Sequence, residues 1–182
     1  TINATDSMGL TTTASLNVVI NTPPTAPNIE IAPNPADTSD ILQAIASGST
    51  DADGDDITYS YEWYQNGNPT TNTTTSVPST DTAKGESWMV RVVANDGNSD
   101  SPAVETSIII SNQAPVLSSL AISPTAPTTS ETLSCQGTAS DLDGDTLTET
   151  YSWTNQTTGT TLGSNSTLML TPSSVSPSDV VQ

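Results

Sequence analysis

Residues 51–63 read DADGDDITYSYEW, an acidic turn that leads directly into a strand with alternating apolar positions. Ninety positions later, residues 141–153 read DLDGDTLTETYSW. The residues of the first stretch that recur at that one offset include Asp51, Asp53, Gly54, Asp55, Tyr61 and Trp63. Because chance does not align six such residues, the sequence predicts a tandem repeat with a period of about ninety residues.

The remaining parts of the chain follow the same offset. Asp6 matches Asp96 and Ile20 matches Ile110, and proline-rich segments at residues 21–28 and 112–115 are typical of stiff linkers. We therefore predict the last strands of one repeat at residues 1–21, a complete repeat at 22–112, and at 113–182 an incomplete repeat that lacks its last strands. The period is thus circularly shifted in this chain.

Two explanations of this shift stay open. One is that the sequence is a window cut from a longer array. The other is that it is a subunit of a filament, whose residues 1–21 complete the open sandwich formed by residues 115–182 of a neighbour. The second explanation predicts head-to-tail assembly by strand complementation, since an open sandwich exposes strand edges that a donated strand can satisfy.

Alternation of apolar residues predicts strands throughout and no helix. Val90, Val92 and Ala94 share one predicted strand face, as do Ile57, Tyr59, Tyr61 and Trp63. Further strands are expected at Thr12–Ile20 and over Leu147, Tyr151 and Trp153, and Cys135 is expected to be buried. Short strands at this spacing predict an all-β chain of Ig-like β-sandwich repeats.

Composition excludes several function classes. The chain has 20 acidic and two basic residues, no histidine and a net charge of -18, which excludes a basic nucleic-acid footprint and disfavours anionic lipid. Apolar content is only 32%, so disorder is an alternative, but the alternating runs and three tryptophans argue against it. No apolar run approaches the ~18 residues of a membrane span, and Cys135, as the single cysteine, forms no disulfide within the chain.

These motifs resemble a known group of proteins. The stretch from Ala46 to Tyr59, then Val90–Gly97, then a strand that ends at Asn112 before Pro115, is similar to bacterial and archaeal cadherin-like and PKD-like repeats. The resemblance covers the whole chain and implies Ig-like β-sandwiches of large secreted or surface proteins. Many members of this group serve as stalks, adhesins or filament modules, and some bind calcium. The chain lacks the full interdomain calcium motif of vertebrate cadherins.

The acidic turns are candidate calcium sites. In an Ig-like sandwich the loop after the second strand and the last hairpin lie at one pole, so Asp51, Asp53 and Asp55 are expected near Asp96. The second turn, at Asp141, Asp143 and Asp145, would need Asp6 from the complementing segment. Clustered carboxylates repel unless neutralised, and Ca²⁺ accepts six to eight oxygens from irregular loops.

The alternative is that each aspartate serves turn geometry through hydrogen bonds to the backbone. An EF-hand does not fit, since Asp56 stands where that loop needs glycine, and the counterpart of Glu62 is Ser152. Turn and calcium explanations both stay open at this point.

Other candidate sites are weaker. Four sequons begin at Asn3, Asn72, Asn155 and Asn165 and are candidate glycosylation sites of a secreted protein. Trp63, Tyr61, Trp153, Tyr151 and Trp88 are expected in the cores, while an aromatic platform for surface glycans is the alternative, with Tyr59 and Tyr64 more exposed. Without histidine there is no usual nucleophile–base pair, and the acids lie on loops without an apparent cleft, so no enzymatic activity is expected.

The sequence therefore predicts a non-catalytic structural module of a stalk, adhesin or filament, outside the cell or on its surface. It is expected to associate with itself or with neighbouring repeats and to use calcium. The alternative is a carbohydrate-binding accessory module of a secreted enzyme.

Overall fold

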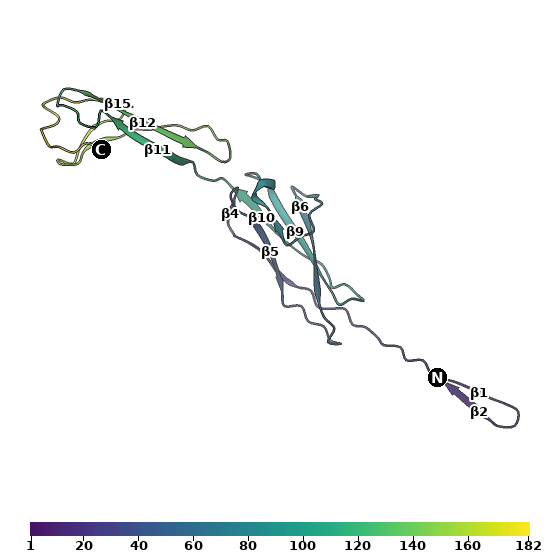
Figure 1. The fold of residues 1–182 in the computed structure, drawn as a ribbon. Coiled ribbons are helices and arrows are strands. Elements are labelled where there is room, and N and C mark those ends of the chain that lie inside the picture. The colour runs from purple at the N-terminus through teal and green to yellow at the C-terminus, as the bar shows by residue number, and fades with distance from the viewer. The chain divides into compact units, whose positions relative to one another are not determined.

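The computed structural model describes all of residues 1–182 and contains strands but no α-helix (Figure 1). Its single helical turn is the three-residue 3₁₀ helix η1 (Ser79–Asp81). Thr, Val and Ile fill the strands, and Gly, Pro and Asn fill the turns, which is the distribution that favours sheets over helices. The prediction of an all-β chain with several sheets is confirmed. No helix has the length and apolar character needed to cross a bilayer.

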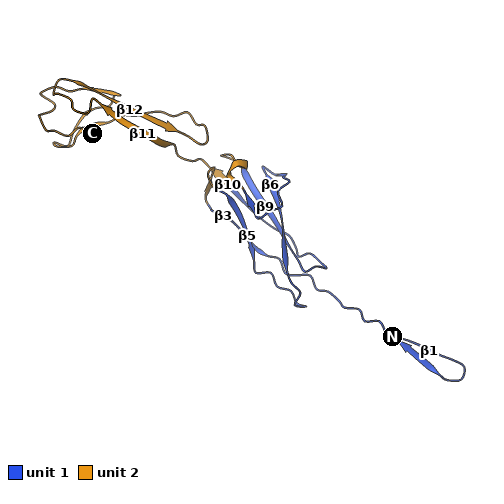
Figure 2. Cartoon of the chain, in the orientation of Figure 1, with its two compact units in different colours: residues 1–34, 41–77, 87–108 blue, residues 35–40, 78–86, 109–182 orange.

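Two compact units are coloured in Figure 2. The first comprises residues 1–34, 41–77 and 87–108, and the second comprises residues 35–40, 78–86 and 109–182. The predicted division at residues 21–22 and 112–113 stays a prediction.

Residues 28–111 form two sheets, an arrangement consistent with a β-sandwich. The five-stranded sheet has the order β4 (Ala36–Asp37), β10 (Val104–Ser111), β9 (Ser87–Asn95), β6 (Thr58–Gln65) and β7 (Asn68–Pro69). The three-stranded sheet has the order β3 (Asn28–Ala32), β5 (Leu42–Ser47) and β8 (Ser76–Val77). β3 and β8 lie at the two edges of this sheet, and β8 is only two residues long.

Strand β9 shows why these sheets form. Trp88, Val90, Val92 and Ala94 alternate with half-buried residues and are at most 3% exposed, so one face of the strand lies entirely in the core, as its period of two predicts. On the antiparallel neighbour β6, Trp63 is fully buried opposite Val90. The turn that joins β6 to β7 has positive φ at Asn66 and Gly67, the conformation that matches the twist of a two-residue hairpin.

The N-terminal segment forms the hairpin β1 (Ile2–Thr5) and β2 (Thr11–Ala14), with Ile2 opposite Ala14. A turn at residues 7–9 joins the two strands. The strand predicted at Thr12–Ile20 ends at Ala14, so that prediction is wrong beyond Ala14. Residues 15–20 have no neighbouring strand to complete their hydrogen bonds. All of residues 1–20 are exposed.

Residues 113–182 contain one three-stranded sheet and one hairpin. The sheet has the order β11 (Val116–Ser123), β12 (Thr132–Ser140) and β15 (Thr167–Met169), and the hairpin pairs β13 (Trp153–Asn155) with β14 (Thr160–Gly163). Their core consists of Leu133, Trp153, Leu168, Leu170 and Val175.

Two predictions for this part of the chain are wrong. The strand expected from Leu147 through Trp153 begins only at Trp153, because no strand pairs with residues 147–152, whereas in residues 58–65 the whole of β6 pairs with β9. Cys135 is half-buried rather than buried, since it lines an open apolar depression over β11 and β12.

Candidate functional site

The first acidic turn is held by one carboxylate. Asp51 Oδ1 accepts hydrogen bonds from the backbone N–H of Asp53 at 2.8 Å and of Asp55 at 3.2 Å. Gly54 has a φ of 83°, a left-handed conformation that glycine adopts without a steric penalty. The turn geometry that the sequence offered as an explanation for the aspartates is therefore present, at least for Asp51.

Turn geometry does not use all the oxygens of this turn. Asp51, Asp53 and Asp55 each offer a carboxylate oxygen, and these atoms lie within 4.8 Å of one another. Asp53 Oδ2 accepts from the backbone N–H of Thr22 in the linker at 2.6 Å, whereas Asp51 Oδ2 is buried and has no hydrogen-bond partner. A buried carboxylate oxygen without a partner is costly, so the donor set fits a hard cation such as Ca²⁺.

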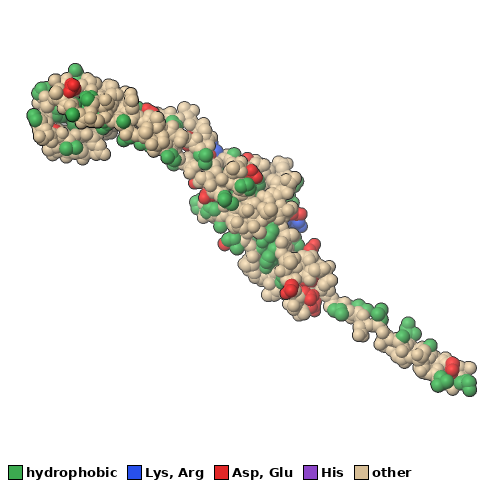
Figure 3. Space-filling model, in the orientation of Figure 1, with side chains coloured by type: hydrophobic (Ala, Val, Ile, Leu, Met, Phe, Trp, Pro, Cys, Tyr) green, Lys and Arg blue, Asp and Glu red, His purple; other side chains and the backbone are tan.

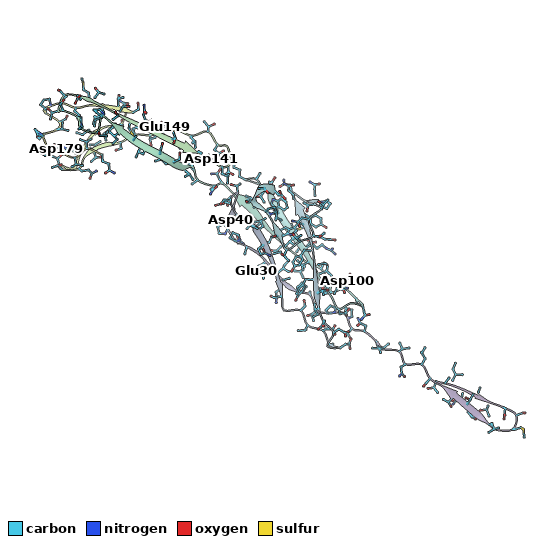
Figure 4. All side chains as sticks on the ribbon, viewed as in Figure 1. Glu30, Asp40, Asp100, Asp141, Glu149 and Asp179 are labelled. Atoms are coloured by element: carbon cyan, nitrogen blue, oxygen red, sulfur yellow. The ribbon has the colours of Figure 1, made fainter.

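The second acidic turn repeats these contacts (Figure 4 labels Asp141 at its start, after β12). Asp141 Oδ1 accepts from the N–H groups of Asp143 at 2.9 Å and Asp145 at 3.1 Å. Asp143 Oδ2 accepts from the N–H of Gln113 at 2.7 Å, as Asp53 does from Thr22. The three carboxylates again bring oxygens within 4.8 Å of one another.

A lysine distinguishes the second turn from the first. Lys84 Nζ donates to Asp145 Oδ1 and, at 3.3 Å, to Asn112 Oδ1. Its bond to Asp145 and the nearby charges of Asp143 and Asp141 raise the pKa of Lys84, so its ammonium group is charged at neutral pH. The pKa of Asp143 is lowered, chiefly by the Thr38 hydroxyl and then by the Gln113 N–H.

The other two predicted ligands lie outside these clusters. Asp96 Oδ1 accepts from the N–H groups of Asn98 and Ser99, both at 2.7 Å, and its Oδ2 accepts from Asn21 Nδ2 at 2.9 Å. Asp6 holds the exposed hairpin turn in a similar way, accepting from Met8 and Leu10 N–H groups at 2.8 and 2.9 Å. Both carboxylates therefore serve their own turns, and neither joins a group of three acids.

Asp96 gives a prediction for acid stability. Its hydrogen bonds, first to Asn21 and then to the Ser99 N–H, lower the pKa of this carboxyl. A carboxyl whose pKa is lower in the folded state stabilises the fold above its unfolded pKa of about 3.9, and the contribution is lost as pH falls through the folded pKa. We therefore expect Asp96→Asn to flatten the fall of the melting temperature below about pH 4. Melting curves of both proteins between pH 7 and pH 2 measure this, and unchanged curves would contradict it.

An apolar surface of residues 113–182 is the second candidate site, and we call it the open face. It is a depression of about 420 Å³ lined by β11, β12 and the segment 148–153, with Leu117, Leu120, Ile122, Cys135 and Trp153 among its side chains. Leu117 and Leu120 are 60% and 64% exposed. Side chains of this kind are usually covered in sandwiches, so the open face is a candidate docking surface.

The tryptophans do not form an exposed platform. Trp63, Trp88 and Trp153 are at most 3% exposed, and Trp153 Nε1 donates to the Asn165 carbonyl at 2.8 Å, as Trp63 Nε1 does to Thr74 at 2.9 Å. Their predicted place in the cores is confirmed. Tyr59, Tyr61, Tyr64 and Tyr151 are half-buried.

The sequons differ in exposure. Asn3 and Asn165 are exposed, and Asn72 is half-buried with its Nδ2 bonded to the Ser76 carbonyl at 2.7 Å. Asn155 is completely buried and its Nδ2 donates to Asp179 at 2.7 Å. The atom that a glycan would modify is thus enclosed at Asn155.

The sequence matches no model of a known protein family and no curated protein.

Sequence reasoning missed Lys84 and the linker N–H groups of Thr22 and Gln113. A signal for the linker contacts was present, since each of these residues follows an asparagine, Asn21 or Asn112, just before a proline-containing segment. Nothing local signalled Lys84, because its partner Asp145 lies 61 residues away.

Proposed function

We propose that this chain is a non-catalytic structural module of an extracellular or cell-surface stalk, adhesin or filament, and that it assembles head to tail by strand complementation. The occupant of the open face is residues 1–21 of a second copy. The observation that carries the proposal is that an uncovered apolar face and an unattached apolar segment occur in the same chain.

The segment supplies side chains of the required kind. Leu16, Val18, Val19 and Ile20 are 73–91% exposed, and Ile2, Met8 and Leu10 are 72–88% exposed. Figure 3 shows hydrophobic side chains, coloured green, along the N-terminal segment. Val18 and Ile20 match Ile108 and Ile110 at the ninety-residue offset, and those two residues of β10 are 7% and 1% exposed. The free segment thus has the side chains that a covered strand has.

The estimated free energies of burial and of association favour reversible assembly. Burying about six aliphatic side chains at ~1.5–3 kcal/mol each gives roughly 9–18 kcal/mol. Association costs an estimated 4–15 kcal/mol in lost freedom, and strand pairing with residues 148–152 adds backbone hydrogen bonds. We therefore expect assembly that depends on concentration in the micromolar range or above.

Tandem Ig-like repeats underlie this proposal. Two observations support such repeats. The two acidic turns make the same hydrogen bonds ninety residues apart. The Nε1–H groups of Trp63 and Trp153, which are also ninety residues apart, both donate to a backbone carbonyl. The proposed location outside the cell rests on the resemblance to surface repeats and on the strongly acidic composition.

Sedimentation velocity over a concentration series tests the assembly. We expect the weight-average sedimentation coefficient to rise with concentration, and an excess of a synthetic peptide of residues 1–21 to return the protein to monomers by occupying the open faces. A peptide of the same composition in scrambled order is the control. A monomer at every concentration would refute head-to-tail assembly.

We also propose that the first acidic turn binds calcium through Asp51, Asp53 and Asp55. A ligand at 100 times its Kd stabilises the folded state by ~2.7 kcal/mol. We expect CaCl₂ to raise the melting temperature, a chelator to reverse the rise, and Asp51→Asn to abolish it. Asp81→Asn, at an exposed acid outside both turns, is the matched control. If the melting temperature is the same with calcium and with chelator, the three aspartates do not bind calcium and serve only to form the turn.

A further inference from the structure

The proline-rich segment before β3 lies against loops of the two sheets and is not a free linker. We call residues 21–27 the strap. Pro24 and Pro27 of the strap are buried, whereas all of residues 1–20 are exposed. Because proline has a fixed φ, the strap loses little backbone freedom when it docks, and a few bonds are enough to hold it.

Two loops hold the strap near its ends. Asn21 Nδ2 donates to Asp96 Oδ2 at 2.9 Å and to Ser99 Oγ at 3.1 Å. The Thr25 N–H donates to the Thr50 carbonyl at 2.9 Å, and Thr25 Oγ1 accepts from the Thr50 N–H at 2.8 Å. These loops follow β9 of one sheet and β5 of the other, so the strap connects the two sheets.

Between these contacts the strap is bonded to the first acidic turn. The Thr22 N–H donates to Asp53 Oδ2 at 2.6 Å. A bond from a backbone N–H to a carboxylate is charge-assisted and about twice as strong as a bond between neutral groups. The second acidic turn contains the same bond, since Asp143 Oδ2 accepts from the Gln113 N–H at 2.7 Å. The middle aspartate is thus used in the same way in both turns.

We propose that Asp53 is the anchor of the strap and keeps residues 21–27 docked as one unit. The other two aspartates of the turn have a different role. Asp51 Oδ1 accepts from the N–H groups of Asp53 and Asp55 and so forms the turn, and only Asp53 bonds to the strap. The role of Asp53 needs neither calcium nor association of chains. In a stalk of tandem repeats, a docked strap shortens the free chain between neighbours.

Amide hydrogen exchange of the full chain, followed by NMR in the presence of a chelator, tests the proposal. The chelator removes divalent ions, so the result does not depend on the proposed calcium binding. In the wild type we expect the Thr22 and Thr25 amides to exchange about tenfold or more slowly than the Ala26 amide, which is exposed and has no hydrogen bond. Asp53→Ala is expected to bring both threonine amides close to the rate of Ala26.

The Thr25 amide is the decisive reporter, because it is bonded to the Thr50 carbonyl and not to Asp53. It loses protection in Asp53→Ala only if the strap leaves as a unit. The matched control is Asp55→Ala, which removes a neighbouring carboxylate of the same turn and should leave both amides protected. The turn remains in both variants, since its donors are backbone N–H groups.

Three results would overturn the proposal: an unprotected Thr25 amide in the wild type, unchanged exchange of Thr25 in Asp53→Ala, and equal release of the strap by Asp55→Ala. The amides of β9 report whether the sheets stay folded. If Asp53→Ala also exposes β9, Asp53→Asn takes its place, because asparagine keeps the shape of the side chain and loses the charge. That variant should speed the exchange of both threonine amides with β9 protected, and unchanged rates would refute the role of Asp53.

Discussion

Replacing Leu117 and Leu120 together by aspartate is expected to abolish association of the chain while leaving its fold intact. Both side chains are about 60% exposed in the single chain and lie outside the core of Leu133, Trp153 and Leu168. In the proposed assembly they become buried, and an unpaired carboxylate in an apolar interface is strongly unfavourable. Sedimentation velocity and circular dichroism of the double variant measure association and fold.

The control replaces Ile41 and Ile109 together by aspartate, which adds the same two charges on side chains that are 59% and 66% exposed elsewhere on the chain. This variant should associate like the wild type. Unchanged association of the Leu117/Leu120 variant would show that the open face is not the docking surface, and loss of association in both variants would point to added charge as the cause.

Trp63→Ala is expected to destabilise the fold by about 3–5 kcal/mol. Its side chain is completely buried, contacts Trp88 edge to face with ring centroids 6.3 Å apart, and donates Nε1 to the Thr74 carbonyl at 2.9 Å. Alanine removes the packing and leaves the Thr74 carbonyl without its donor. Since single domains have only about 5–15 kcal/mol of stability, a substantial part of it is lost. Urea unfolding at pH 7 measures the change.

The neighbouring Tyr64→Ala provides the comparison. Tyr64 is half-buried on the same strand, and its hydroxyl donates to Glu62 at 3.4 Å on the surface. We expect a loss of no more than about 1 kcal/mol, the usual order for a side chain that keeps contact with water. Equal losses for Trp63 and Tyr64 would contradict the assignment of the core.

Strand positions with covered neighbours could be predicted from the sequence. The alternation predicted over Val90, Val92 and Ala94 agrees with β9, because it depends only on the local pattern of residues. The strands predicted at Thr12–Ile20 and over residues 147–153 are shorter than expected, since a strand also needs a partner that the local pattern does not specify.

In the candidate sites, too, contacts between residues close in sequence could be predicted, and contacts between distant residues could not. The three aspartates of each turn meet because they are separated by only one residue. Asp96 was expected to join the first turn on the basis of sandwich topology, and its oxygens instead bond to Asn21, Asn98 and Ser99. The pairing of Lys84 with Asp145 spans 61 residues and depends on tertiary structure.

Cross-linking of Cys135 tests the central claim most directly. This only cysteine lines the open face, and Val18→Cys places a second thiol on the segment proposed to occupy it. We predict a ladder of covalent multimers with a short thiol–thiol cross-linker, and far fewer with Met8→Cys, which is at least as exposed but lies on the hairpin turn. Monomers alone, or internally linked monomers, in the Val18→Cys variant would contradict the account.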